Sequence, residues 1–527
     1  MSSSRLLIFF MSITLFFICS CKNESGISSE DISKREIRST IRFLGGDLLE
    51  GRALGTRGGR LAENYIRSVL EILDIAPYEG SHFQEFALSG HTMRRLSMVL
   101  GGESLRYRED VMGSYVGNDD SFALKGELVF AGFGIISEPW SWDDYGESEL
   151  EGKIVLVRVN EPGRDDPELF EGPALTYFGR WTYKIEEAAR RGARGILLIH
   201  TRDSAGYGWQ VVRNSWGGEE HYLPSMLDND LLFRGWIREE KLEKILADRD
   251  ISLRELYRKS DRRNFRPVAL GITSRIEGDS RHREFLTRNV VGYIEGSDSR
   301  LNSKSIILSA HIDHLGMDTS LEGDRIFNGA IDNGSAVASM MAVAKRLREQ
   351  QEKLKYSVIV LACNAEEAGL LGSRYFAGSV EPSSIVANIN FECTPVWERS
   401  RDFIAVGARY SSLEEIIRGI VKDRGLSYSY FSMSNQGFFY RSDQFSFARR
   451  GIPAVWLSAG EDYISGVNRL REFFLGDYHT VNDEFDPEWE LESTIQTVEI
   501  TLDLIDYINR EQPVLQWKGR MTFPVEE

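Results

Sequence analysis

The chain has 527 residues, which is too long for a single compact core, so we expect two or three domains. Hydrophobic residues make up 42% of it and charged residues 27%, a balance that excludes a disordered or fibrous protein. Lysine and arginine number 63 against 80 aspartates and glutamates, and the resulting net charge of -17 repels phosphate backbones, so we expect no nucleic-acid partner.

The first 21 residues are predicted to be a lipoprotein signal peptide. Arg5 precedes an apolar run that is too short to span a membrane, and the chain turns polar at Lys22. The cysteine at this junction, Cys21, resembles the modified residue of a bacterial lipobox. The resemblance implies that a diacylated Cys21 anchors an exported protein to a bacterial membrane, facing the periplasm or the cell exterior. An ordinary signal peptide cut nearby is the alternative.

The segment that follows the leader is predicted to be a tether. Residues 22–34 are polar and rich in serine and glutamate, and apolar residues at helical spacing then predict a helix over 61–73. The glycine-rich, basic loop at 50–59 favours either an anion site at the start of this helix or a plain turn. No stretch after the leader reaches the ~18 apolar residues of a transmembrane helix.

Two cysteines remain after the leader, Cys363 and Cys393. Two are too few for a disulfide scaffold, so we expect both to be buried free thiols.

The region from about 120 to 270 has the pattern of an accessory domain. Strands are predicted at 127–132, 153–157 and 195–199, with an amphipathic helix near 183–191. The region contains no grouping of carboxylates with histidine, and its aromatic loops are expected to pack rather than to bind.

From residue 289 onward, short β-rich runs alternate with helices, a pattern typical of an α/β fold with a mostly parallel sheet. The predicted strands are 289–294, 305–310, 356–362, 385–391, 402–406 and 452–457, and the predicted helices are 335–347 and 491–508.

Possible metal ligands follow the ends of several of these strands or lie in nearby loops. In chain order they are His311, Asp313, His314, Asp332, Glu366, Glu367, Glu392 and His479. Functional residues of open α/β sheets gather beyond the carboxyl ends of the strands. Carboxylate and imidazole ligands together suit zinc, with manganese or cobalt as substitutes.

Five segments, in order, resemble the motifs of the M28 family of zinc peptidases. They are 309–316 (SAHIDHLG), 328–335 (NGAIDNGS), 364–373 (NAEEAGLLGS), 440–444 (YRSDQ) with 451–454 (GIPA), and 478–483 (YHTVND). The early segment 49–52 (LEGR) also fits, and the middle region resembles a protease-associated (PA) domain.

This resemblance implies a fold of class α/β, in which a mostly parallel-sheet zinc exopeptidase domain carries an inserted, smaller, β-rich PA domain. The expected boundaries are a signal peptide at 1–21, a tether at 22–34, the N-terminal part of the peptidase domain at 35–118, a PA-like domain at 119–272, and the main part of the peptidase domain at 273–527.

The resemblance also implies two zinc ions per chain, bridged by Asp332. His479 and Glu367 would complete one site, and His311 and Glu392 the other. A bridging carboxylate suits paired metals that lie roughly 3.5–4 Å apart.

Two further residues would serve the reaction. Glu366 is expected to act as the general base, a role worth about 10²–10⁴ in rate. Asp313 is expected to orient the imidazole of His311. His314 is expected to contact a ligand, although an exchange of roles with His311 stays open.

The chain departs from the family pattern at two positions. Glu392 stands where relatives more often have aspartate, so its carboxylate reaches one methylene further. Gln444 stands where many relatives have histidine, and we do not count it as a ligand. Phe439, Tyr440 and Arg441 are candidates for the wall of the substrate pocket, and an ordinary aromatic core cluster accounts for them equally well.

We therefore expect hydrolysis of a terminal peptide bond by metal-activated water. An aminopeptidase acting on peptides with a free N-terminus is favoured, because that is the commoner activity among secreted relatives of this architecture. The alternatives are a carboxypeptidase, a glutaminyl cyclase on the same scaffold, and a catalytically silent, receptor-like peptide-binding protein. The sequence does not indicate an oligomeric state.

Overall fold

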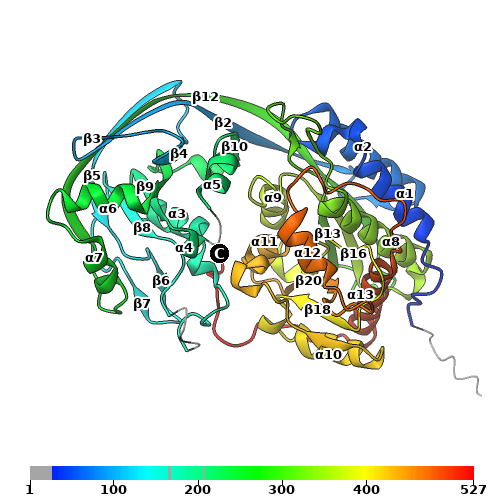
Figure 1. Cartoon of the computed structure of the whole chain (residues 1–527). Helices are drawn as coiled ribbons and strands as arrows, with labels where there is room; N and C mark the ends of the chain where they lie inside the picture. Colours follow the sequence, from blue (N-terminus) through cyan, green and yellow to red (C-terminus); the bar gives the residue numbers. More distant parts are fainter. Residues whose placement is uncertain (1–25, 164–165, 167, 206–207, 527) are drawn as a thin grey trace, which may run out of the picture.

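The computed structural model describes residues 26–526, with gaps at 164–165, 167 and 206–207. The predicted signal peptide and Cys21 lie outside these residues. The chain forms two lobes that a long, curved ribbon of strands joins (Figure 1). Within the described ranges, no helix combines the length and the apolar character needed to cross a membrane.

The main lobe, residues 26–82 and 289–526, is built around parallel strands. The central four are β20 (Ala454–Ala459), β17 (Ile385–Asn390), β13 (Ser305–His311) and β16 (Ser357–Cys363), adjacent in that order. Strand β18 (Asp402–Val406) lies antiparallel to β20 and carries β19 (Ser427–Ser429) at the edge. The large, mostly parallel sheet confirms the predicted α/β class.

Helices cover both faces of this sheet. On one face lie α2 (Arg57–Ile72), α8 (Ala336–Glu349), α10 (Leu413–Asp423) and α13 (Glu492–Glu511). On the other lie α9 (Leu371–Ser379) and α11 (Gln444–Ala448). Successive residues of β13 alternate between the two layers, with Leu308 in the first and Ile307 in the second. Because these strands are buried on both faces, they are continuous apolar runs, and the sequence predicted their bounds to within two residues.

The second lobe, residues 101–267, has its own set of parallel strands. They are β5 (Ser121–Phe130), β8 (Ile154–Arg158), β9 (Gly195–His200) and β11 (Phe233–Arg238), with β4 (Val111–Tyr115) antiparallel at the edge. Helix α3 (Trp181–Arg190) precedes β9, which gives the predicted strand–helix–strand unit. Helices α6 (Glu239–Ala247) and α7 (Leu253–Ser260) pack on one face of the sheet. That this lobe is a PA domain, and that it is bounded at 119 and 272, remain predictions.

The ribbon between the lobes consists of β2 (Phe83–Leu100) and β12 (Val268–Ile294). They pair antiparallel from Phe83 opposite Val290 to Leu100 opposite Ser274. Strand β12 also pairs with β5 in one lobe and with β16 in the other, so the sheet is continuous between them. The sequence predicted only 289–294 of this strand, because several buried positions of the rest are not apolar residues but Ser274, Gly278 and Ser280.

The segment just before the first helix packs on the main lobe. The Ile27 side chain is buried, and its amide donates to Asp506 Oδ1 at 2.7 Å. The amide of Ser28 donates to Gln350 Oε1 at 2.8 Å. Residues 26–28 of the predicted tether are thus held against the fold, and helix α1 (Lys34–Leu44) follows.

Candidate metal centre

The predicted ligands converge because they follow neighbouring strands at one edge of the sheet. His311 is the last residue of β13, and Glu366, Glu367 and Glu392 lie in the turns after β16 and β17. Asp332 lies in an irregular turn (Ala330–Ser335) directly before α8, and its own backbone angles, φ -102° and ψ 90°, are not helical. The sixth residue, His479, arrives from the loop after α12 (Arg469–Gly476). The carboxyl ends of parallel strands meet at one edge, so tertiary structure brings together residues that are up to 168 positions apart.

The backbone turns sharply where these side chains enter the site. Ala365, Cys393 and His479 adopt φ values of 61°, 38° and 59°, in the left-handed region that residues other than glycine rarely occupy. Such conformations cost of order 1–3 kcal/mol each and cluster at functional sites. The strained positions are therefore consistent with ligands that must be aimed at one point.

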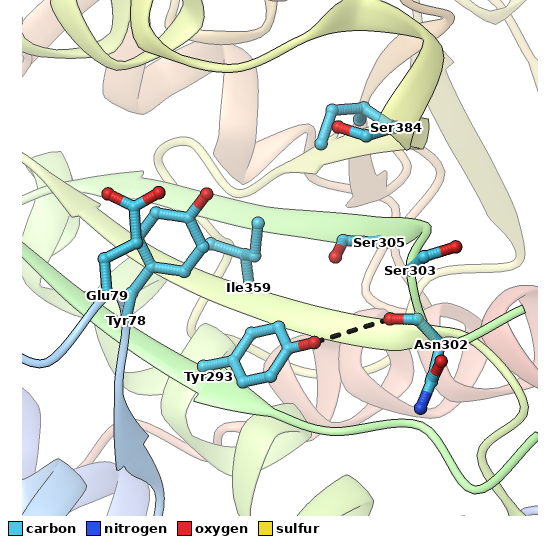
Figure 2. Close-up of a pocket in the computed structure, with 9 residues that line it drawn as sticks. Tyr78, Glu79, Tyr293, Asn302, Ser303, Ser305, Ile359 and Ser384 are labelled. Atoms are coloured by element: carbon cyan, nitrogen blue, oxygen red, sulfur yellow. Dashed lines mark hydrogen bonds between the residues drawn. The ribbon is translucent and has the colours of Figure 1, made fainter. Parts of the chain in front are cut away.

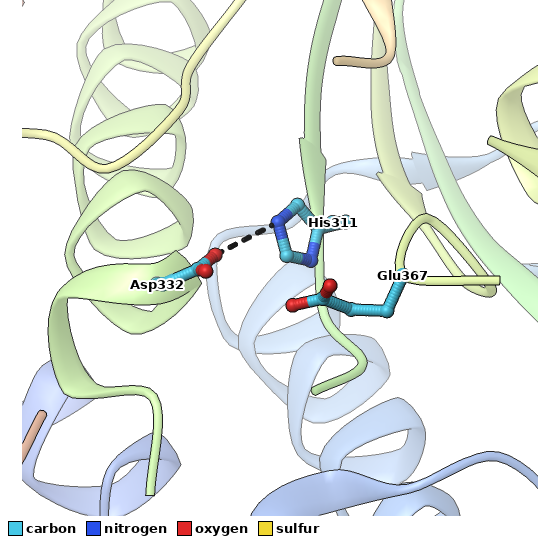
Figure 3. Close-up of side chains that lie close together, drawn as sticks. All are labelled: His311, Asp332 and Glu367. Carbon is cyan, nitrogen blue, oxygen red and sulfur yellow. Dashed lines mark ion pairs between the residues drawn. The ribbon is translucent and has the colours of Figure 1, made fainter. Parts of the chain in front are cut away.

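The ligand atoms form two groups that share Asp332. In the first group, His311 Nε2 lies 3.2 Å from Asp332 Oδ1 and 3.2 Å from Glu392 Oε1. In the second group, His479 Nε2 lies 3.1 Å from Asp332 Oδ2 and 3.3 Å from Glu367 Oε2. Figure 3 shows the side chains of His311, Asp332 and Glu367 directed toward one another. Ligands at zinc distances of about 2.0–2.2 Å in a tetrahedron lie about 3.3 Å apart, so both groups have the spacing of zinc ligands.

Two atoms of the second group are buried without a hydrogen bond. Asp332 Oδ2 and His479 Nε2 face each other, yet neither makes a hydrogen bond with any described residue. A buried polar atom without a partner costs about 1–3 kcal/mol, so native structures rarely leave one unsatisfied. A cation bound between these atoms would satisfy both, and oxygen and nitrogen donors together fit zinc.

The charge of the site also favours a cation. Burial alone would lower the pKa of His479, but the carboxylates of Glu367 and Asp332 outweigh it and raise the pKa to about 10. Burial likewise opposes ionisation of Asp332, but the neighbouring imidazoles of His311 and His479 hold its pKa well below the ordinary value. Four carboxylates surround two imidazoles here, so positive charge is stabilised at this point.

Glu366 lies beside the first ligand group. Its Oε2 is 4.0 Å from His311 Nε2, which is farther than any of the ligand contacts. Burial raises the pKa of the Glu366 carboxyl well above its ordinary value, with the charges of Glu392 and Glu367 acting in the same direction. Its place beside the ligands, and not among their shortest contacts, makes Glu366 the candidate for a general base.

Asp313 was expected to orient His311 through its carboxylate, but the contacts of this residue are different. His311 Nδ1 lies 3.1 Å from the backbone carbonyl oxygen of Asp313, whereas the carboxylate oxygen is 3.8 Å away. The carboxylate instead accepts the backbone N–H groups of Glu366 at 3.1 Å and Glu367 at 3.2 Å. Asp313 therefore orients the imidazole by its main chain and shapes the Glu366–Glu367 turn by its side chain.

Several residues hold the ligands from behind: His314, for which the sequence predicted contact with a ligand, and others to which it assigned no role. His314 Nδ1 lies 2.8 Å from Glu367 Oε1, and Ser442 Oγ donates to Glu392 Oε2 at 2.6 Å. The Cys393 thiol lies 3.6 Å from Glu392 Oε1, and Asp483 accepts the amide of Asp332 at 2.9 Å. Ser442 and Asp483 belong to the matched motifs, and that was the only signal that pointed to them. Cys363 and Cys393 are both free and buried, as predicted.

The three residues predicted to wall a substrate pocket have other neighbours. Phe439 and Tyr440 are each only 4% exposed, and their rings pack 6.0 Å and 6.4 Å from that of Phe523 near the C-terminus. Arg441 lies over the ring of Phe438 at 5.0 Å. The aromatic pair is thus part of a core cluster, the alternative that the sequence left open. Gln444, at the second position that departs from the family, is buried and bonded to Asn390 and to the Phe439 carbonyl.

A cavity of about 310 Å³ lies at the other end of the sheet (Figure 2). Ser305, the first residue of β13, lines it, and the Tyr293 hydroxyl donates to the Asn302 carbonyl there at 3.4 Å. A strand rises about 3.3 Å per residue, so this cavity is roughly 20 Å from His311 at the end of the same strand. It is therefore separate from the metal centre.

Comparisons with known proteins agree with this geometry. Residues 289–503 match the sequence profile of Peptidase family M28. A vacuolar membrane protease of Yarrowia lipolytica (strain CLIB 122 / E 150) is 30% identical over 148 residues, which is 27% of this chain and 14% of the relative's length.

Among solved structures, an aminopeptidase from Aneurinibacillus sp. strain AM-1 has a TM-score of 0.54 and 18% identity, covering 94% of this chain and 98% of that one. A zinc aminopeptidase from Bacillus subtilis has a TM-score of 0.43 and 16% identity, covering 94% and 98%. The first of these likenesses shows a shared fold over nearly the whole of both chains.

Proposed function

Since residues 289–503 match the sequence profile of Peptidase family M28, we propose that the protein is a zinc-dependent exopeptidase, and more specifically an aminopeptidase that acts on peptides with a free N-terminus. One observation carries the proposal: the two carboxylate oxygens of Asp332 face two different histidines, each of which has a further carboxylate at ligand spacing. This arrangement supports two ions with Asp332 between them.

In the proposed reaction, some residues would bind metal and another would transfer a proton. His311 and Glu392 would hold one zinc ion, and His479 and Glu367 the other, with Asp332 shared. Bound zinc would polarise the scissile carbonyl and lower the pKa of water from 15.7 towards about 7. Glu366 would take the proton of the attacking water and pass it to the leaving amine. The burial that raises the pKa of Glu366 suits a group that must accept and then release a proton.

Metal content measured together with turnover tests the proposal. The chain without residues 1–21 would be assayed with aminoacyl-4-nitroanilides and with the same compounds acetylated at the amine. We expect about two zincs per chain and chelator-sensitive cleavage of the free-amine compounds alone. Cleavage only of substrates with a free C-terminus would replace the aminopeptidase by a carboxypeptidase. One zinc with cyclisation of N-terminal glutamine would replace it by a cyclase, and zinc-free, inactive protein would favour a peptide-binding role.

We also propose that a lipid on Cys21 holds the protein on a bacterial membrane. The proposal rests on the basic, apolar and cysteine-terminated pattern of residues 1–21. Replacing Cys21 by serine should move the protein from the membrane fraction to the soluble fraction of the cells that express it. Retention of the variant in the membrane fraction would contradict the proposal.

A further inference from the structure

Arg52, in the early LEGR segment, is buried at the back of the metal centre. Its side chain is 1% exposed, and its guanidinium group makes no hydrogen bond to a carboxylate within the described residues. All of its hydrogen bonds go to backbone carbonyls. The acceptors are those of Leu44, Ile312 at 2.9 Å, Asn328 at 2.5 Å, Gly329 at 3.0 Å and Asp332 at 3.3 Å.

Most of these carbonyls belong to the two loops that carry metal ligands. Ile312 lies between His311 and Asp313, and Asp332 is itself the shared ligand. The backbone of Arg52 also contacts the first of these loops, because its carbonyl accepts a hydrogen bond from the amide of His314 at 3.4 Å. One side chain thus ties the loop after β13 to the loop before α8, and ties both to the N-terminal segment.

The local sequence explains how an arginine reaches this place. Glu50, Gly51 and Arg52 have φ values of 50°, 66° and 52°, so three successive residues are in the left-handed region. A Cβ atom at Gly51 would lie 2.3 Å from the Gly316 carbonyl oxygen and 2.6 Å from that of Phe327. Only glycine allows this close approach, and the resulting turn directs the Arg52 side chain inward. The part of the 50–59 loop that contains Arg52 is therefore neither a plain turn nor an anion site, because the Arg52 side chain binds backbone carbonyls.

An arginine suits this position better than a lysine. The guanidinium carries five N–H donors in a rigid plane, whereas an ammonium carries three on a flexible stem. Burial lowers the pKa of Arg52, while the carboxylates of Asp483, Asp332 and Asp313 oppose that effect. The positive charge is thus compensated by carboxylates that it does not contact directly.

We propose that Arg52 is a positioning residue, which holds the His311–His314 and Asn328–Asp332 loops in their ligating arrangement before any metal ion binds. The inference rests on the proposed function only in that these loops bind metal. It requires no particular substrate.

The main test compares two buried arginines. Arg52→Lys should weaken binding of zinc, measured by competition with a chromophoric chelator, by about 10–100-fold, the usual effect of losing a group that positions a ligand. Arg449→Lys is the matched control, because Arg449 is 6% exposed and contacts Glu186 and Tyr177, away from the ligands. It should bind zinc as the parent does, even if it melts at a lower temperature. Equal zinc affinity in Arg52→Lys and the parent would overturn the proposal.

A second measurement does not depend on whether a variant folds. Amide hydrogen exchange of the parent protein would be followed before and after removal of zinc with a chelator. The amides of residues 311–314 and 329–334 should stay protected in the zinc-free protein, because Arg52 holds these loops without metal. Rapid exchange there after zinc removal would show that the ions hold the loops, and would overturn the proposal. If the parent binds zinc but cleaves no peptide, the proposed function fails while both measurements still decide the role of Arg52.

Discussion

Asp332 presents one carboxylate oxygen to each of two histidines, at 3.2 Å and 3.1 Å, and this single side chain defines the plan of the site. The other polar side chains of the site lie in two groups that share Asp332. Glu366 Oε2 is 4.0 Å from His311 Nε2, farther than the contacts within either group, so the proposed general base is distinct from the proposed metal ligands. The two tasks can therefore be tested separately.

Glu366→Gln should abolish turnover without removing metal. The amide keeps the size of the carboxyl but cannot accept the proton of water, so we expect kcat to fall by about 10²–10⁴. Zinc content, measured by atomic emission, should stay at the parent value. Turnover within threefold of the parent would exclude Glu366 as the general base.

Ser442→Ala should selectively weaken the binding of one zinc ion. The Ser442 hydroxyl donates to Glu392 Oε2 at 2.6 Å and thereby turns Oε1 toward His311. Loss of such a bond behind a ligand costs about 10-fold or more in metal affinity. Stepwise zinc titration should show one affinity lowered and the other unchanged.

The control for this variant is Ser458→Ala, another buried hydroxyl of the main lobe. Among the described residues, its Oγ donates only to the Ala459 carbonyl, at 2.9 Å, within β20. Both zinc affinities should match the parent in this variant. An equal loss of zinc affinity in the two variants would mean that a general destabilisation of the fold, and not the lost hydrogen bond to Glu392, accounts for the effect.

At the scale of elements, α3 and the segment that links β8 to it in the second lobe contain two buried charged residues, Glu161 and Lys184. Glu161 is 5% exposed and accepts the Thr176 amide at 2.9 Å, while Lys184 donates to the carbonyls of Asn160 at 2.9 Å and Phe178 at 2.7 Å. Burial raises the pKa of Glu161 to about 7 and lowers that of Lys184 to about 7. This segment also carries Tyr177, which touches the main lobe.

The stability of this element should fall as pH rises through the weakly acidic range. The folded pKa of Glu161 lies above its unfolded value of 4.5, so its protonated form stabilises the fold below pH 4.5 and that contribution is lost by about pH 7. The shift corresponds to about 3 kcal/mol. Thermal melting followed from pH 4.5 to 7 should therefore show a steeper decline in the parent than in Glu161→Gln, which cannot ionise. Parallel curves would contradict the assignment.

At the scale of the whole molecule, the C-terminal segment joins the two lobes. Figure 1 shows the chain end lying between them. The Thr522 carbonyl accepts the amide of Tyr177 from the second lobe, and its hydroxyl accepts a hydrogen bond from Tyr440 of the main lobe at 2.8 Å. Arg449 contacts Glu186 of α3 and Glu526 of the C-terminal segment. The ribbon of β2 and β12 is thus supplemented by a second connection.

Phe523→Ala should loosen this connection. Phe523 is 2% exposed and packs against Phe445 at 5.4 Å and Trp517 at 5.4 Å, so we expect a loss of about 3–5 kcal/mol. The neighbouring Val525 is 48% exposed, and Val525→Ala should cost less than about 0.5 kcal/mol. Chemical denaturation and small-angle scattering would detect the weaker fold and the wider separation of the lobes. Equal behaviour of the two variants would exclude the C-terminal segment as a connection.

The sequence by itself determined the α/β class, the central strands and the identity of the ligand candidates. Strands such as β13 and β16 are buried on both faces and so are continuous apolar runs, and the residues directly after them must lie at the edge of the sheet. His311, Glu367 and Glu392 could therefore be predicted from local pattern and motif alone.

Only the tertiary structure decided how these parts meet. Three sets of contacts join residues far apart in the chain. They are the two groups around Asp332, the hydrogen bonds from Arg52 to backbone carbonyls, and the packing of Phe523 against Phe439. The long strands of the ribbon were missed because several buried positions of β12 hold small or polar residues, such as Ser280, whose hydroxyl donates to the Thr92 carbonyl of the partner strand β2. A local pattern specifies which face of an element is buried, whereas the contacts across that face depend on every other element that packs there.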